Sequence, residues 1–153
     1  MSFNILLVDD SPTDAAILQA SFDDFTEQQQ IQVLTSGVAM LQFIENYNSS
    51  SCLPALILLD LNLPQISGHE LLKTLKAHQT WGLIPVIILS SSSAPSDIAK
   101  SYALHANAYI TKPKSFEEYQ KMAKKIYSFW QGTVTLPLRE HVFSKSTSVE
   151  TNR

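Results

Sequence analysis

The sequence is poor in cysteine: Cys52 is the only one in 153 residues. A single cysteine cannot form an internal disulfide and cannot build a cysteine-based metal cluster, so neither kind of stabilised small domain applies here. A chain with this cysteine content suits a reducing compartment.

Long apolar runs are also missing. The longest, such as ALILL at 55–59, are far shorter than the roughly 20 residues that a membrane-spanning helix needs. The N-terminus has no basic segment and reaches Asp9 and Asp10 within its first ten residues, so no signal peptide is predicted. We therefore expect a cytoplasmic protein that has no membrane partner.

The chain has no excess of positive charge. Its formal net charge is -3 and its isoelectric point is near 5.7. Direct binding of nucleic acid is not expected, because phosphate backbones are held by lysine and arginine. A chain of this length suits one domain, which would bury roughly two-thirds of the surface of the unfolded chain.

Five apolar runs alternate with helix-like segments along the chain. This alternation is typical of an α/β fold in which helices cover both faces of a parallel sheet. The runs predict strands at 3–9, 31–35, 55–60, 84–90 and 107–110.

Helices are predicted between these strands. Ser11, Pro12 and Asp14 resemble an N-cap, a first-turn proline and a capping-box acid. The apolar stripe of this first helix is Ala15, Leu18, Phe22 and Phe25. A second helix is indicated by Val38, Leu41 and Ile44, a third by Leu71, Leu72 and Leu75, and a weaker segment at 95–104 by Ile98 and Tyr102.

The last helix has the clearest apolar stripe. Ser115 and Glu118 repeat the cap pattern, and the stripe consists of Phe116, Tyr119, Ala123, Ile126 and Trp130. For Tyr102 and Trp130 two roles stay open, because each could belong to the core or to an interface.

The chain continues beyond residue 132, where the predicted domain 1–132 ends. The extension 133–143 carries Val134, Leu136, Leu138, Val142 and Phe143, which need a partner surface. It could form a homodimer contact, or it could fold back on its own domain. Residues 144–153 contain few large apolar groups and are predicted to be a disordered tail.

Polar side chains stand where the predicted strands end. Asp9 and Asp10 follow the first strand and Asp60 the third, Ser90 closes the fourth, and Lys112 follows the fifth. Functional groups of an open parallel sheet gather beyond the carboxyl ends of its strands, so we expect these five to converge.

Three neighbouring carboxylates repel one another unless a cation lies among them. Oxygen ligands favour Mg²⁺ or Mn²⁺, and Mg²⁺ often completes its shell with water and substrate phosphate. With Lys112 and one divalent ion the set is formally neutral and suited to a phosphoryl group. Taken singly, each residue could instead be a solvated strand end, a loop serine or a surface lysine.

The complete set resembles the receiver domain of bacterial response regulators, the CheY-like family. Asp10 and Asp60 are 50 residues apart, Asp60 and Ser90 are 30 apart, and Ser90 and Lys112 are 22 apart. The resemblance covers about residues 3–130 and rests on LLVDD, LLDLNLP with Gly68, VIILS and YITKP. It implies a flavodoxin-like, doubly wound sheet of five strands in the order 2-1-3-4-5 with five helices.

The resemblance also implies the parts of a phosphorylation site. Asp60 would be the phosphoacceptor. Asp9, Asp10 and Asp60 would hold Mg²⁺, with Mn²⁺ as a substitute, and the Asn62 backbone carbonyl would be a further ligand. The protein would be a signalling phosphoacceptor that assists its own phosphorylation and dephosphorylation, and not an enzyme acting on a separate substrate.

Three more residues would bind phosphate and switch. Ser90 would supply the switch hydroxyl, Lys112 would pair with the phosphoryl group, and Tyr109 would be the switch aromatic. Phosphorylation would change the face formed by the fourth helix, the fifth strand and the last helix. The bond between Lys112 and Pro113 is often cis in the family, so a cis bond is expected here.

A narrower likeness is carried by SYALHANAYITKP at 101–113 and FWQGTVTLP at 129–137. These segments look like those of the stand-alone regulators paired with cyanobacterial phytochrome kinases. The resemblance therefore implies a sensor histidine kinase of the phytochrome type as partner.

Three other functions compete with this one. A dehalogenase-like phosphatase needs a second acid two residues after its nucleophile, and position 62 is asparagine. A flavin-binding domain needs a phosphate-binding loop after the first strand, where Asp9 and Asp10 would repel the ligand. The remaining alternative is a phosphorylation-independent interaction module with the receiver fold, although all five polar positions are filled.

Overall fold

The structure is a computed structural model that describes residues 3–24, 29–48 and 51–137. Strands and helices alternate through these residues, with one short 3-10 helix before the fourth strand. Their bounds are β1 Phe3–Val8, α1 Pro12–Asp23, β2 Gln29–Leu34, α2 Gly37–Glu45, β3 Leu56–Leu59, α3 Gly68–Ala77, η1 Trp81–Leu83, β4 Val86–Ser90, α4 Pro95–Ala103, β5 Ala108–Thr111 and α5 Phe116–Gly132.

The five strands form one sheet in the order β2-β1-β3-β4-β5, and every neighbouring pair is parallel. The predicted doubly wound α/β fold is confirmed. Because β1 lies between β2 and β3, the strand order reverses at β1. The carboxyl ends of β1 and β3 therefore flank the crevice in which ligands bind in such folds.

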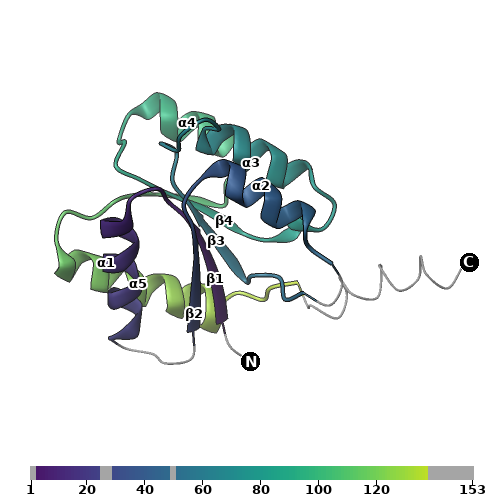
Figure 1. The fold of residues 1–153 in the computed structure, drawn as a ribbon. Helices are drawn as coiled ribbons and strands as arrows, with labels where there is room; N and C mark the ends of the chain where they lie inside the picture. Colours follow the sequence, from purple (N-terminus) through teal and green to yellow (C-terminus); the bar gives the residue numbers. More distant parts are fainter. Residues whose placement is uncertain (1–2, 25–28, 49–50, 138–153) are drawn as a thin grey trace, which may run out of the picture.

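The central strands β1, β3 and β4 are buried on both faces, which explains why they appear as continuous apolar runs. In β1, Leu6 and Val8 belong to the core beneath α2 and α3, whereas Ile5 and Leu7 belong to the core beneath α1 and α5. Figure 1 shows the two layers: α2, α3 and α4 lie on one side of the sheet, and α1 and α5 lie on the other.

The caps and stripes of the helices agree largely with expectation. Ser11, Ser67 and Ser115 each accept a hydrogen bond from the backbone N–H three residues later. Ala15, Leu18 and Phe22 are buried on α1, as are Leu71, Leu72 and Leu75 on α3. Phe25 lies outside the described residues.

Aromatic and apolar side chains on α5, α4 and α2 refine the sequence pattern. Phe116 was expected in the stripe of α5 but is 45% exposed, and it is the first residue of that helix. Tyr102 is 50% exposed, so it is a surface residue, whereas Trp130 packs against the core. On α2 the fully buried side chain is Met40, flanked by half-buried Val38, Leu41 and Ile44.

The first part of the extension, residues 133–137, runs back along its own domain. Leu136 is half-buried and packs against the core beneath α1 and α5. Leu138, Val142, Phe143 and the predicted tail 144–153 lie outside the described residues. Across the described part of the chain, no helix has both the length and the apolar character needed to cross a membrane.

Candidate functional site

The carboxyl edge of the sheet brings the predicted residues together. Asp9 and Asp60 follow the paired residues Val8 and Leu59 of β1 and β3. The Asp60 N–H donates to the Val8 carbonyl at 2.9 Å, which continues the ladder by one residue. The Lys112 N–H donates to the Ser90 carbonyl at 2.7 Å. Regular backbone pairing thus fixes where these side chains start.

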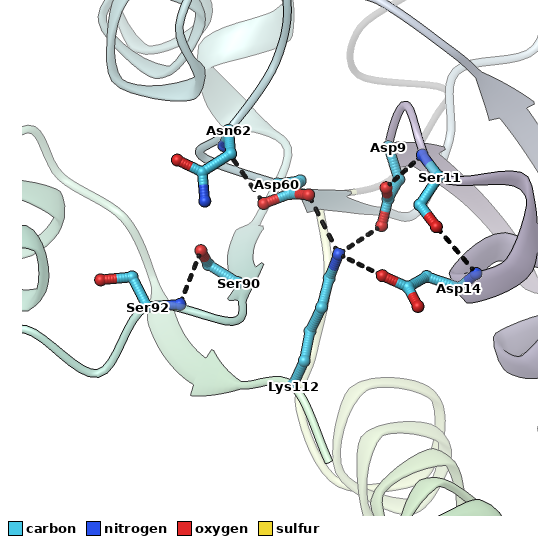
Figure 2. Close-up of polar contacts among 8 residues, drawn as sticks. All are labelled: Asp9, Ser11, Asp14, Asp60, Asn62, Ser90, Ser92 and Lys112. Carbon is cyan, nitrogen blue, oxygen red and sulfur yellow. Dashed lines mark hydrogen bonds and ion pairs between the residues drawn. The ribbon is translucent and has the colours of Figure 1, made fainter. Parts of the chain in front are cut away.

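The ammonium of Lys112 lies at the centre of the site. Its Nζ is 2.9 Å from Asp9 Oδ2, 3.0 Å from Asp60 Oδ2 and 2.8 Å from Asp14 Oδ2. Figure 2 shows the lysine rising from the end of β5 into the space between the three carboxylates. The Lys112 side chain is only 9% exposed, and those of Asp9 and Asp60 are 2% and 6% exposed. This is a buried ionic cluster, not a set of solvated strand ends.

Three of the acids are placed to share a metal ion. Asp9, Asp10 and Asp60 each offer a carboxylate oxygen, and these atoms lie within 4.8 Å of one another. Oxygens bound to one Mg²⁺ at about 2.1 Å are at most about 4.2 Å apart, so small side-chain movements would bring the three into one shell. Asp10 is exposed, which leaves the ion's remaining positions open to water and ligand. The donor set therefore fits a divalent cation.

Burial and charge shift the pKa values of two groups in the cluster. Burial raises the pKa of the Asp9 carboxyl above its usual range, although the Ser11 N–H and the Lys112 ammonium act in the opposite direction. Burial alone would lower the pKa of Lys112, but its hydrogen bonds to Asp14, Asp9 and Asp60 outweigh burial and raise it above its ordinary value of 10.5. Lys112 is therefore a permanent cation at neutral pH.

Ser90 and Tyr109 meet at one residue of the loop between β4 and α4. The fully buried Ser90 hydroxyl accepts a hydrogen bond from the Ser92 N–H at 3.3 Å. The Tyr109 hydroxyl donates to the Ser92 carbonyl at 2.7 Å, and the half-buried tyrosine packs against the core beneath α2 and α3. Ser92 thus connects the two predicted switch residues, a role that sequence analysis did not assign.

Gly68, the first residue of α3, lies directly against the backbone of Asp60. A Cβ atom at position 68 would overlap the Asp60 carbonyl oxygen and the Leu61 Cα. The Gly68 N–H donates to the Leu61 carbonyl at 2.9 Å. Glycine is required here because the start of α3 approaches the Asp60 backbone closely.

The expectations for Asn62 and for the bond before Pro113 have different outcomes. The Asn62 N–H donates to Asp60 Oδ1 at 3.2 Å, while metal binding by the Asn62 carbonyl stays a prediction. The bond before Pro113 is trans, because no cis peptide bond occurs in the described residues. The cis expectation is therefore wrong for this structure, and trans is the intrinsically favoured form.

Asp14 is the site residue that sequence analysis missed. It was expected to act as a capping-box acid, but the Ser11 N–H donates instead to Asp9 Oδ1 at 2.9 Å. The Asp14 carboxylate binds Lys112, which lies 98 residues away in the sequence. The available signal was its place in the first turn of a helix that starts at the carboxyl edge.

The fold and this acidic site define a receiver domain. Residues 5–124 match the response regulator receiver domain family, and the chain belongs to this family. It is therefore a response regulator protein of two-component signalling.

Its relatives include cyanobacterial response regulators. The chain is 39% identical to response regulator Rcp1 of Synechocystis sp. over 135 residues, which cover 87% of this chain and 92% of Rcp1. The crystal structure of the Mn²⁺-bound form of Rcp1 has a TM-score of 0.79 and covers 88% of this chain and 99% of its own. The phosphorylated cyanobacterial phytochrome response regulator RcpA is 34% identical with a TM-score of 0.83, and the match covers 90% of this chain and all (100%) of the RcpA chain. The expected likeness to phytochrome response regulators is confirmed.

Proposed function

We propose that Asp60 accepts a phosphoryl group from a sensor histidine kinase of the phytochrome type. The observation that carries this proposal is the buried contact of 3.0 Å between Lys112 Nζ and Asp60 Oδ2, beside the carboxylates of Asp9 and Asp10. The phytochrome pairing is supported by the likeness to RcpA.

Asp9, Asp10, Asp60 and the Asn62 carbonyl would hold Mg²⁺, and Mn²⁺ would fit the same oxygens. A bound divalent ion would neutralise the negative charge that spreads over the oxygens of the phosphoryl group during its transfer. The Mn²⁺-bound Rcp1 structure supports a divalent site in a related protein.

The Asp60 carboxylate attacks the phosphorus of a phosphohistidine in line. The new bond joins a carboxylate oxygen to phosphorus, while the P–N bond breaks and its electron pair returns to the imidazole nitrogen. No general base is needed, because the nucleophile is already ionised. Lys112 pairs with the phosphoryl oxygens. In dephosphorylation, water attacks the phosphorus, the bond between the Asp60 oxygen and phosphorus breaks, and inorganic phosphate leaves with the water's oxygen, which restores the Asp60 carboxylate.

The added charge of about -1.5 to -2 drives the switch. The Ser90 hydroxyl turns to a phosphoryl oxygen and leaves the Ser92 N–H, after which Tyr109 and the α4-β5-α5 face rearrange. A shift from mostly inactive to mostly active requires about 5.5 kcal/mol of preference. One opposite-charge pair at about 4 Å contributes about 4 kcal/mol at an effective dielectric of about 20, so Lys112, Ser90 and the metal suffice in scale.

The test is phosphorylation by acetyl phosphate and Mg²⁺, followed on a phosphate-affinity gel. The wild type is expected to be labelled, Asp60→Asn to remain unlabelled, and Asp23→Asn to behave as the wild type. Asp23 is the matched control, because it is an exposed carboxylate at the far end of α1. An unlabelled wild type would instead favour an interaction module that works without phosphorylation, and equal labelling of Asp60→Asn would place the acceptor elsewhere.

We further propose that residues 1–132 act as the receiver, that the protein works in the cytoplasm, and that it forms a homodimer to which the extension 133–143 contributes. Apolar side chains in the extension support the dimer, although Leu136 already packs on its own domain. Size-exclusion chromatography before and after phosphorylation tests it. A monomer in both states would contradict it.

A further inference from the structure

The first turn of α1 presents Asp14 to the site in a fixed position. Its backbone N–H donates to the Ser11 hydroxyl at 3.2 Å, which caps the helix. Its carboxylate takes no part in that cap, because the Ser11 N–H is bound by Asp9 Oδ1. The Asp14 carboxylate is thus available to Lys112, which it contacts at 2.8 Å.

Lys112 has no spare hydrogen-bond donor in this arrangement. An ammonium group carries three N–H donors, and Nζ lies within 3.0 Å of an oxygen of each of Asp9, Asp14 and Asp60. A phosphoryl oxygen on Asp60 can reach Nζ either in place of Asp60 Oδ2 or, as an added acceptor, in place of a neighbouring carboxylate. Asp14 is the one to leave, because it is 34% exposed and water can solvate it, whereas Asp9 and Asp60 are buried.

Asp14 also changes the charge of the pocket. With Asp9, Asp10 and Asp60 it makes four carboxylates around one ammonium, so a bound divalent cation leaves one net negative charge. This surplus attracts a cation and repels the oxygens of an incoming phosphoryl group.

On the basis of the proposed function, we propose that Asp14 is a positioning residue that holds the Lys112 ammonium on the α1 side of the pocket, strengthening binding of a divalent cation and slowing phosphoryl acceptance at Asp60. It acts through Lys112 and does not itself touch the transferring group. Phosphorylation breaks the ion pair between Asp14 and Lys112 and so releases the first turn of α1 from the site.

Two measurements on the full chain test this role. The first is the dissociation constant for Mn²⁺ alone, measured by the electron paramagnetic resonance signal of free Mn²⁺. The second is the rate of labelling by acetyl phosphate at saturating Mg²⁺. For Asp14→Asn we expect Mn²⁺ binding to weaken and labelling to accelerate, each by about two- to five-fold, the range of one partly exposed ion pair.

The combination of weaker Mn²⁺ binding and faster labelling distinguishes positioning from a structural role, since a damaged fold would weaken binding and slow labelling. Asp23→Asn removes the same charge from the exposed end of α1 and is expected to change neither. Asp14→Glu keeps the carboxylate and is expected to restore both values to within about two-fold of the wild type. The inference is overturned if Asp14→Asn weakens Mn²⁺ binding and also slows labelling, or if it matches Asp23→Asn. Absence of label in the wild type overturns the proposed function as well, so the two failures are distinguishable.

Discussion

Helices α1 and α4 both start beside the proposed phosphorylation site, but they are held in different ways. α1 buries Ala15, Leu18 and Phe22 in the core and adds the ion pair between Asp14 and Lys112. α4 has Ser101 as its one fully buried residue. One helix is therefore anchored by apolar burial and an ion pair, while the other depends on side-chain hydrogen bonds.

The side-chain hydrogen bonds of α4 lie at its start and at the buried Ser101. Its N-cap residue, Ala94, makes no side-chain cap, and the Ser92 hydroxyl donates to Asp97 Oδ2 at 2.5 Å instead. His69 Nε2 on α3 lies 2.9 Å from Ser101 Oγ. The bond to the Asp97 carboxylate contributes about 1.5 to 3 kcal/mol and the bond to Ser101 about 0.5 to 1.5 kcal/mol. The comparison indicates that α1 is part of the scaffold, whereas α4 is held by a few polar contacts and can move at a lower cost.

The largest expected effect on the free energy of unfolding comes from removing a buried apolar side chain. Leu18→Ala on α1 should lower the free energy of unfolding by about 2 to 5 kcal/mol, because Leu18 is fully buried and a cavity would remain. The matched change on α4, Ile98→Ala, should cost less, since Ile98 is half-buried. Urea unfolding measures both. Equal losses would show that α4 is as firmly packed as α1.

The ionic anchor of α1 should have the next largest effect. Lys112→Met leaves the carboxylates of Asp9 and Asp60 buried without their cation, which should cost about 2 to 3 kcal/mol in the presence of a chelator. Adding Mg²⁺ should recover part of this loss, because the same carboxylates would then be neutralised by the ion. Urea unfolding with and without Mg²⁺ checks this, with Lys121→Met, an exposed ion-pair lysine, as control. A loss independent of Mg²⁺ would contradict the shared role of these acids.

The contrast between the helices also explains what the sequence could predict. Apolar periodicity located α1 through Ala15, Leu18 and Phe22, because a helix anchored by burial carries that pattern. The strand ends located Asp9, Asp60 and Lys112, since parallel strands bring their carboxyl ends together.

The parts that were missed depend on contacts between distant segments. Asp14 has the spacing of a cap acid, and only the folded sheet brings Lys112 to it. Ser92 stands in the run SSSS at 90–93, in which four identical side chains carry no sign of which one bonds to Asp97. Such choices depend on loop geometry, which composition and periodicity do not encode.

Two serine substitutions compare the starts of the helices directly. Ser11→Ala removes the cap of α1 and should lower global stability by about 1 kcal/mol, because α1 is integral to the core. Ser92→Ala removes the bond to Asp97 and should leave global stability within about 0.5 kcal/mol, while amide hydrogen exchange in the first turn of α4 accelerates. Acceleration spread over the whole chain would contradict local control of α4.

The smallest effect concerns the pH dependence of the contact between α3 and α4. Burial, and then Lys100, lowers the pKa of His69 below its ordinary 6.5, although Asp97 acts in the opposite direction. Between the lowered pKa and 6.5 the unfolded chain binds the proton more readily than the folded one, so this contribution to stability is complete above pH 6.5 and is lost as the pH falls.

His69→Gln removes this titration. From about pH 7.5 to about pH 5.5 the wild type should therefore lose more unfolding free energy than the variant, with faster exchange of α4 amides at the lower pH. His78→Gln is the matched control, because the Nδ1 of His78 accepts backbone N–H groups at the start of η1, away from α4. An identical pH dependence in the wild type and in His69→Gln would mean that His69 does not hold α4. The contrast with α1 would then depend on Ser92 and Asp97 alone.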